Sequence, residues 1–537
     1  MKNIPIDMSN FKDIIEQNYL YVDKTKFIYD IVKRNKYYFL SRPRRFGKSL
    51  SVSTLQAVFE GRRELFKGLY IENKDLDWEE YPIIKLDYNE ITNTSKERMK
   101  EDITNVLLQI AQKYGIKLER TETENIFNEL IKKLSEKYKK GVVVLIDEYD
   151  KPIISHLGKG KERIEVAIEN REFMKVLYDN LKPLEPYLRL VYITGVSKFS
   201  MTSIFSTLNN LIELDIHPEF ADFLGYREEE LKKYFNEYFV KLANKKNENI
   251  EDIYKDFKYM YNGFRFSREE IKVYNPYSIG KALNYQEIDH YWFDSGTPTF
   301  LIDLIKEKNY NITNIENIEV SINSIKAYDI ENLTLISLLF QTGYLTIKDE
   351  DEGIYTLSYP NNEVEKGFCN QLILHMADKK DEAPLIRKIK KAFVAEDYDD
   401  FFELIESMFG GIPYSRIPPN EESARNKELK LKIRLTEREL YYHTIFYLAV
   451  TLMSDNKLRI YPEILSNIGR IDMVIEMENK VYIIEFKCDQ GVEVAMEQIK
   501  KKKYAQKYKH LGKKILLLGI DFDSEERNVR EWKIIEN

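Results

Sequence analysis

Cysteine is scarce in this chain: Cys369 and Cys488 are the only two among 537 residues. They lie far apart and form no CxxC pair, which argues against a disulfide scaffold and against a structural zinc site. Such usage suits a reducing compartment, so we expect the protein to be cytoplasmic.

Long apolar runs are missing as well. No stretch of the sequence approaches the roughly 18 apolar residues that span a bilayer. The opening "MKNIPIDMSNF" also lacks the basic and apolar regions of a signal peptide. These absences predict a protein with no membrane partner.

The composition is that of a globular protein, with 43% hydrophobic and 32% charged residues. Because one hydrophobic core rarely organises 537 residues, we expect several domains. The net charge of −7 argues against general coating of nucleic acid. Residues 500–514 nevertheless carry eight lysines and no acidic residue, which predicts a local basic surface.

Between about residues 35 and 215, short apolar segments alternate with charged, helix-favouring ones. This pattern is typical of an α/β domain with a parallel sheet. The segment "GVVVLID" is apolar to its last residue, as expected of a central strand covered on both faces. The predicted strands are 37–41, 82–88, 141–147, 189–195 and 211–216.

The remaining chain divides by composition. Residues 331–364 predict a helix, a turn at Gly343 and two strands, which is typical of a winged helix and equally of a helix-hairpin packing unit without a DNA role. Pro418-Pro419 within charged sequence predicts a linker. The expected parts are a first α/β domain (1–217), a helical region (218–330), a winged-helix-like region with helices (331–414), a linker (415–430) and a second α/β domain (431–537).

The stretch "YYFLSRPRRFGKSLS" (37–51) supplies the strand, turn and helix N-terminus of a phosphate-binding P-loop. Gly47 allows close backbone approach, Lys48 would reach the β- and γ-phosphates, and Ser49 would hold Mg²⁺. Arg42 occupies the position of the first glycine in the pattern GxxxxGK[ST]. The Gly-Lys-Ser tripeptide alone is therefore a weak signal.

A second motif supports the nucleotide site. The apolar strand "VVVLIDEYD" ends in Asp147, placed to bind Mg²⁺, and Glu148, placed to activate water. Thr194 or Ser197, at the end of the following strand, could sense the γ-phosphate. A core strand with polar residues at its exit is the alternative, but three motifs in this order favour the site.

The segment "GRIDMVIEMENKVYIIEFKCD" (469–489) predicts a hairpin. Glu485 and Lys487 are two residues apart on one strand and share a face, and Asp472 lies on the partner strand. The carboxylates can hold Mg²⁺ or Mn²⁺, and the lysine can position or deprotonate a water that attacks a phosphodiester. The spacing D-x(12)-E-x-K matches the signature of PD-(D/E)XK nucleases.

Flanking residues extend this candidate site. Glu439 could supply a third carboxylate, and Gln498 and Tyr504 on a lysine-rich helix could meet the backbone or the scissile phosphate. That helix would then contact DNA. The alternative is an exposed strand without catalytic role, because a bare ExK pattern is common.

Together these motifs resemble a bacterial and archaeal family in which an AAA-ATPase-like domain precedes a PD-(D/E)XK nuclease domain. The resemblance covers nearly the whole chain, and "RPRRFGKS" is distinctive because that family's P-loop also lacks the first glycine. Phe264 stands where we expect Tyr. The matching segments are "YVDKT" (21–25), "RPRRFGKS" (42–49), "LIDEYD" (145–150), "TGVSKFS" (194–200), "YNGF" (261–264), "NPYS" (275–278), "QTGYLT" (341–346), "YPNNEV" (359–364) and "IIEFK" (483–487).

The resemblance implies an α/β fold: a P-loop parallel-sheet ATPase domain, a helical and winged-helix-like middle region and a C-terminal α/β restriction-endonuclease-like domain. It also implies two centres, formed by Lys48, Ser49, Asp147 and Glu148 for ATP and Mg²⁺, and by Asp472, Glu485 and Lys487 for the nuclease.

Arginines would complete the nucleotide site. Arg42, Arg44 and Arg45 would add positive charge beside a triphosphate. Arg265 is a candidate for the arginine that contacts the γ-phosphate from the lid, and Arg227 is its rival. An arginine supplied by a neighbouring copy would require a homo-oligomer.

The sequence thus predicts a cytoplasmic ATPase whose nucleotide state governs a metal-dependent nuclease acting on DNA. The alternative belongs to another class: a nucleotide-switched binding or signalling protein whose C-terminal domain binds nucleic acid without cleaving it. The intact set of Asp472, Glu485 and Lys487 favours the enzyme.

Overall fold

The computed structural model describes residues 1–198, 201–295, 301–302, 305, 315, 317–321, 334–377, 383–410, 442–466 and 469–537. The chain forms two compact units. The first consists of Met1–Leu304 and Glu319–Glu363, and the second of Ile305–Ile318 and Val364–Asn537. The predicted region 331–414 is thus divided after residue 363, and the predicted linker 415–430 lies outside the described residues.

A parallel five-stranded sheet organises the first unit and confirms the predicted α/β fold. All six residues of its strand β3 are buried, which explains why that segment is apolar up to Asp147, its last residue. Each strand lies where the sequence predicts it, although β5 has two residues. The spatial order is β2 (Ile83–Asp87), β3 (Val142–Asp147), β4 (Leu188–Gly195), β1 (Tyr37–Ser41) and β5 (Ile212–Glu213).

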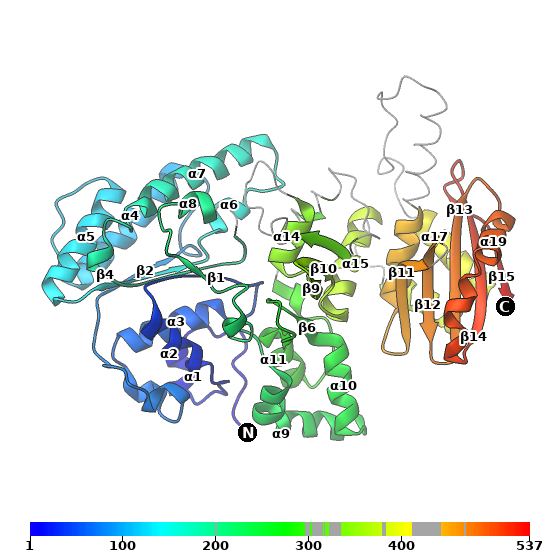
Figure 1. The fold of residues 1–537 in the computed structure, drawn as a ribbon, viewed down its shortest axis with the longest axis horizontal. Coiled ribbons are helices and arrows are strands. Elements are labelled where there is room, and N and C mark those ends of the chain that lie inside the picture. Colours follow the sequence, from blue (N-terminus) through cyan, green and yellow to red (C-terminus); the bar gives the residue numbers. More distant parts are fainter. Residues whose placement is uncertain are drawn as a thin grey trace. The chain divides into compact units, whose positions relative to one another are not determined.

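Helices cover both faces of this sheet (Figure 1). One face carries α1 (Phe11–Glu16), α2 (Thr25–Arg34) and α3 (Lys48–Phe59), and the other carries α4 (Lys96–Lys113), α5 (Thr123–Tyr138) and α7 (Lys161–Asp179). Helix α4 shows the reason: its buried residues Met99, Ile103, Leu107 and Ala111 recur every four positions and form one apolar stripe. Because β4 lies between β1 and β3, the loops after these three parallel strands meet at one edge of the sheet.

The remainder of the first unit contains a helical cluster and a small sheet. The cluster packs around one apolar core and comprises α9 (Glu228–Lys246), α10 (Ile250–Tyr261) and α11 (Pro276–Tyr285). A hairpin of β6 (Asn262–Phe264) and β7 (Val273–Tyr274) adjoins it. Short elements complete the unit: α6 (Lys151–Ile154), α8 (Met201–Ile204), η1 (Arg63–Phe66), η2 (Tyr70–Asn73), η3 (Glu185–Tyr187), η4 (Pro218–Phe220) and η5 (Trp292–Ser295).

The predicted helix, turn and two strands of residues 331–364 are present. They are α14 (Leu335–Thr342), Gly343, β9 (Thr346–Asp351) and β10 (Ile354–Ser358). A further strand, β8 (Ile318–Ser321), which the sequence did not predict, completes a sheet of order β8-β10-β9.

The turn after α14 is pressed against the P-loop. Gly343 caps α14 with a φ of +88°, and a Cβ atom there would lie 2.5 Å from Cγ of Pro43. A side chain at position 343 would therefore meet both backbone strain and a rigid proline ring. The turn between α14 and β9 therefore packs directly on the first residues of the P-loop.

A mixed five-stranded sheet organises the second unit and agrees with the predicted α/β domain. Its strands follow chain order: β11 (Leu458–Ser466), β12 (Gly469–Met477), β13 (Lys480–Cys488), β14 (Lys514–Asp523) and β15 (Asn528–Glu536). Neighbouring strands are antiparallel except for the parallel pair β13 and β14. The hairpin of β12 and β13 is as predicted, whereas β11 and β15 were not predicted. The helices are α15 (Asn362–Ala377), α16 (Ala383–Val394), α17 (Tyr398–Gly410), residues 442–453, α19 (Val492–Lys501) and the 3-10 segment η9 (Tyr504–Leu511).

Strand β13 alternates between two packed faces. Val481 and Ile483 share a core with Met496 of α19. Tyr482 and Phe486 pack on the other face, against Phe393 and Phe446 respectively. By this alternation Glu485 and Lys487 lie on the α19 face.

Among the described residues, no helix combines the length and apolar character needed to cross a membrane.

Gly343→Ala should destabilise the first unit more than Gly353→Ala. The two glycines have nearly equal φ values, +88° and +85°, but a Cβ at Gly353 would meet no atom within 4 Å. Positive φ costs about 1–2 kcal/mol in either variant, and overpacking against Pro43 adds about 1–3 kcal/mol in Gly343→Ala alone. Differential scanning calorimetry of the full chain measures both, and equal shifts would contradict the contact with Pro43.

Candidate functional site

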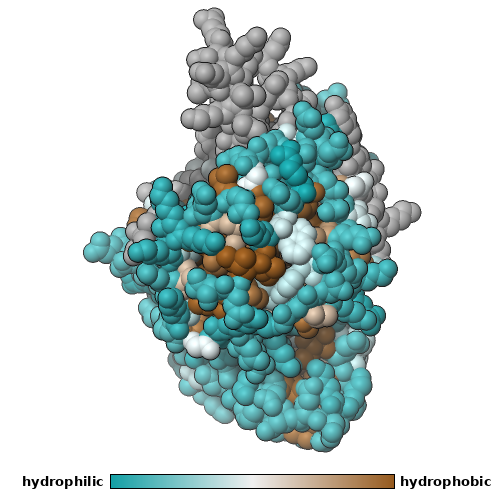
Figure 2. Space-filling model, turned by 90° about the vertical axis from the view of Figure 1, so that its right-hand side faces the viewer, coloured by the Kyte–Doolittle hydropathy of each residue, from teal (hydrophilic) through white to brown (hydrophobic). Residues whose placement is uncertain are grey.

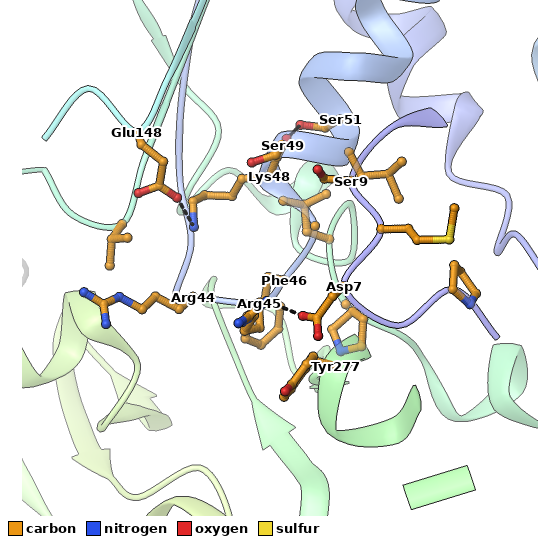
Figure 3. A pocket seen from close by; sticks show the side chains of 18 of the residues that line it. Asp7, Ser9, Arg44, Arg45, Phe46, Lys48, Ser49, Ser51, Glu148 and Tyr277 are labelled. Atoms are coloured by element: carbon orange, nitrogen blue, oxygen red, sulfur yellow. Dashed lines mark hydrogen bonds and ion pairs between the residues drawn. The ribbon is translucent and has the colours of Figure 1, made fainter. Parts of the chain in front are cut away.

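A cavity of about 660 Å³ opens at the edge of the parallel sheet where the loops after β1 and β3 meet (Figure 3). P-loop residues 44–51 line one side, together with Glu148 and Asp150. The N-terminal residues 4–9 and part of α11 line the other. Its volume lies in the range of roughly 300–1,000 Å³ that is usual for small-molecule and cofactor sites.

The P-loop is curled at two positions: Arg45 has a φ of +69° and Gly47 a φ of +94°. Such alternation turns successive backbone N–H groups toward one point, which favours an anion. Helix α3 begins directly after Gly47 and adds the positive end of its dipole. The Lys48 side chain is 4% exposed, with its ammonium 3.5 Å from Glu148 Oε1 and donating to the Pro43 carbonyl at 3.3 Å.

Asp147 lies at the end of β3 beside Thr194 of β4. The Thr194 hydroxyl donates to Asp147 Oδ1. Asp147 Oδ2 is buried and has no hydrogen-bond partner among the described residues. Ser49, in the first turn of α3, lines the cavity, whereas Asp147 lies behind the lining residues. An unpartnered carboxylate oxygen and a hydroxyl fit the hard oxygen ligands that Mg²⁺ prefers.

Ser197 binds a second carboxylate. Its amide and its hydroxyl each donate to Asp150 Oδ2 at 2.7 Å, and the Val196 amide donates to Oδ1 at 3.2 Å. Burial and the nearby charge of Glu148 raise the pKa of Asp150 to about 6. Thr194 and Ser197, predicted to sense the γ-phosphate, are thus bonded to Asp147 at the end of β3 and to Asp150 beyond it, and neither of the two lines the cavity.

The structure corrects two predicted phosphate contacts. Arg42 is 1% exposed, and its guanidinium donates to the carbonyls of Ser41, Asp215 and Phe220. Arg265 is 4% exposed, and it donates to the carbonyls of residues 267, 268, 269 and 348. Neither side chain lines the cavity, because each buried guanidinium is held by backbone carbonyls. Arg227, the rival of Arg265, forms ion pairs with Asp222 and Glu229 and does not line it either.

Arg44 and Arg45 do line the cavity, but they extend in different directions (Figure 3). Arg45 pairs with Asp7, and its guanidinium lies 4.7 Å from the Tyr277 ring. Arg44 is exposed and has no ion-pair partner in the described part of the chain. The positions of Asp7 and Tyr277 at this cavity were not predicted, because nothing in residues 4–9 of the sequence indicates a contact with the P-loop.

The second candidate site lies in the second unit, where β12 and β13 part. Their last paired residues are Met473 and Ile484, and beyond them the Phe486 amide donates to Asp472 Oδ2 at 2.8 Å. Glu485 is 1% exposed, and its Oε1 accepts from Lys487 Nζ at 3.1 Å and from Gln498 Nε2. The structure thus brings together four of the predicted residues from β12, β13 and α19.

Comparison with known proteins identifies the two domains that contain these sites. Residues 5–205 match the family model described as "Predicted AAA-ATPase", and residues 437–532 match the PD-(D/E)XK nuclease superfamily. The "Uncharacterized protein in vnfD 5'region" of Azotobacter chroococcum mcd 1 is 31% identical over 98% of both chains. The chain belongs to this AAA-ATPase-like and PD-(D/E)XK family.

A solved structure of Drosophila ORC bound to poly(dA/dT) DNA and Cdc6 contains a distant structural neighbour. Its identity is 10% and its TM-score 0.25, over 83% of this chain and 61% of that one. A TM-score this low supports no functional conclusion.

The PD-(D/E)XK site contains a carboxylate that the sequence did not reveal. Glu463 lies on β11 between the pairs Pro462–Met473 and Ile464–Ile471, opposite Asp472. It pairs with Arg470 at 2.7 Å, and burial together with Asp472 raises its pKa. Glu463 was not predicted to lie near Asp472, because strand β11 itself was not predicted. Glu439, the predicted third carboxylate, lies outside the described residues.

The donor set of the PD-(D/E)XK site fits a divalent cation. Glu485 Oε2 is buried without a hydrogen-bond partner among the described residues. Within that part of the chain no three His, Cys, Asp or Glu side chains form a ready metal cluster. Mg²⁺ commonly binds through one or two carboxylates and completes its shell with water and substrate phosphate, so Asp472 and Glu485 would suffice.

Glu485→Gln should gain stability over the wild type as the pH rises, with EDTA present. Burial, followed by the charge of Asp472, raises the pKa of Glu485 to about 8, whereas an unfolded glutamate titrates near ~4.3. Between these values the folded state holds more protons, so wild-type stability falls as pH rises through the window. We expect the difference in Tm to widen by at least about 3 °C between pH 5 and pH 8.5.

Thermal unfolding at several pH values measures this difference. Glu497→Gln, which changes an exposed carboxylate on the same helix as Gln498, is the matched control and should show no such trend. A Tm difference for Glu485→Gln that stays constant with pH would contradict the raised pKa.

Proposed function

We propose that this protein binds and hydrolyses ATP and that its C-terminal domain is a Mg²⁺- or Mn²⁺-dependent nuclease acting on DNA. The observation that carries the nuclease assignment is the buried Glu485 carboxylate, bonded to Lys487 of its own strand and to Gln498 of α19 beside Asp472. An ionisable side chain is rarely fully buried, and one whose pKa is strongly shifted by burial and by a neighbouring carboxylate is typical of a functional site.

Lys48 and Glu148 support the ATPase assignment. The Lys48 ammonium lies in the cavity next to Glu148 and would exchange that carboxylate for phosphate oxygens when a nucleotide binds. Glu148 would then be released to orient the attacking water. Bound Mg²⁺ would neutralise charge on the phosphates, with Ser49 and Asp147 as its protein ligands.

In the nuclease domain, Asp472 and Glu485 would hold the cation, which supplies Lewis acidity at the scissile phosphate. Lys487 Nζ donates to Glu485 Oε1 and to the Phe486 carbonyl, so its position is fixed before substrate arrives. From there it would orient the attacking water. Gln498 would hold Glu485 in its binding orientation.

DNA is the preferred substrate class because of the lysine-rich segment after Gln498. Lys500, Lys501, Lys503 and Lys509 are exposed and form no ion pair with any described residue. Figure 2 shows one face of the molecule, on which hydrophilic residues surround several hydrophobic patches. Unpaired lysines would neutralise backbone phosphates and make binding salt-dependent.

Asp472→Ala should abolish metal-dependent cleavage. Labelled plasmid, linear duplex and single-stranded DNA are incubated with Mg²⁺ or Mn²⁺, with and without ATP. Loss of a metal ligand should reduce the rate at least about 10²-fold. Glu478→Gln, an exposed carboxylate in the turn of the same hairpin, should cleave like the wild type. No metal-dependent cleavage of any substrate by the wild type, with ATP binding intact, would favour the nucleotide-switched binding protein.

Lys48→Ala should reduce ATP hydrolysis at least about 10²-fold, because it removes the charge that neutralises the β- and γ-phosphates. Lys67→Ala, an exposed lysine outside the cavity, is the control. If ATP alters cleavage by the wild type but not by Lys48→Ala, the two activities are coupled. A cleavage rate that is the same with and without ATP, and the same in the wild type and in Lys48→Ala, would contradict the coupling but not the nuclease assignment.

A further inference from the structure

The first unit contains a second cavity, of about 250 Å³, on the other side of the P-loop. Two segments of the chain contribute residues to both cavities. From the last residue of β1 into the first turn of α3, residues 41–43 line the second cavity and residues 44–51 line the first. In the loop after β4, Val196 lines the first and Lys198 the second.

The second cavity has excess positive charge. Its side chains Arg42 and Arg265 are buried, and every hydrogen bond of their guanidinium groups goes to a backbone carbonyl. Lys198 is matched by Glu213 and Asp215. Neither buried arginine forms a direct ion pair within the described chain, and burial lowers the pKa of Arg42 to about 10 although the nearby charge of Asp215 opposes this shift. A bound anion would offset the cost of these buried charges.

Arg268 stands at the rim of this cavity. It is exposed, lines the cavity and has no ion pair with a described residue. Its guanidinium is therefore available to a ligand's phosphate or carboxylate, for which its fork geometry is well suited.

The lining residues favour a planar ligand. Phe266, Phe340 and Tyr355 line the cavity, and the Phe266 ring lies 4.2 Å from the Arg42 guanidinium. Arg42 Nε and Asp215 Oδ1 have no hydrogen-bond partner among the described residues. They are a donor and an acceptor on two lining side chains, and a small rotation of each would present both to the edge of a nucleobase.

We propose that this cavity is a second ligand site that takes a nucleoside monophosphate, with the base between the aromatic walls and the phosphate at Arg268. The cavity volume of about 250 Å³ lies just below the range of roughly 300–1,000 Å³ that is usual for small-molecule sites. The cavity would therefore enclose the base, and the phosphate would lie outside it at the exposed Arg268.

A ligand at this site would touch the residues that shape the ATP site. Gln341 of α14 lines the second cavity and accepts from the Lys198 amide at 2.9 Å. Lys198 follows Ser197, which is bonded to Asp150. The monophosphate would therefore act on ATP turnover through the loop after β4, without competing for the P-loop.

Isothermal titration of the full chain with AMP, GMP, CMP and UMP tests the assignment. A saturating non-hydrolysable ATP analogue and Mg²⁺ first fill the P-loop cavity. At least one monophosphate should bind at a stoichiometry of one, and Arg268→Ala should weaken that binding about tenfold or more, since a hydrogen bond to a charged group is removed. Tyr355→Ala should also weaken the binding of the monophosphate, because it removes one of the aromatic rings that line the cavity. Arg120→Ala, an exposed arginine outside both cavities, should not change it.

Three results would overturn the proposal. They are no binding of any monophosphate up to millimolar concentration, binding that neither Arg268→Ala nor Tyr355→Ala alters, and binding that the ATP analogue displaces. Inorganic phosphate and the free nucleosides are titrated in parallel. Equal affinity for phosphate alone would also overturn it, because the aromatic walls would then contribute nothing.

Discussion

One buried carboxylate ties together the loops on which the nucleotide site depends. Asp150, three residues beyond the end of β3, accepts from the Val196 amide, the Ser197 amide and the Ser197 hydroxyl just beyond β4. A further hydrogen bond, from the Thr194 hydroxyl to Asp147, joins the ends of strands β4 and β3. The spatial order β3-β4-β1 makes both connections available, because it puts β4 between the P-loop strand and the acidic strand.

The arginine that replaces the P-loop's first glycine has a structural explanation. Arg42 turns away from the phosphate cavity and fastens the start of the loop to the carbonyls of Asp215 and Phe220. Glycine would leave those carbonyls to water or to another donor. The following Phe46 packs edge-on against Phe264 of the "YNGF" segment, where the ring of a tyrosine would bring a hydroxyl that needs a partner. In this chain the loop is anchored by side chains at both positions.

Patterns with a strict period predicted most of the fold. The limits of β1 follow from its apolar run, and the shared face of Glu485 and Lys487 follows from the two-residue repeat of a strand. The directions of Arg42 and Arg265 could not be predicted, because partners far away in the sequence determine where a long side chain points. Strand β11 was missed because Pro462 and Glu463, with a φ of +49°, interrupt its alternation, and the Glu463 carboxylate was missed with it.

The contact between Gly343 and Pro43 restricts which segments of related proteins can be combined in one chain. These residues lie 300 positions apart, yet neither can be enlarged without displacing the other. A recombination event that joined the parallel-sheet part of one relative to the winged-helix-like part of another would have to match both surfaces at once. The two parts, which belong to the same compact unit, should therefore be exchanged between relatives as one piece.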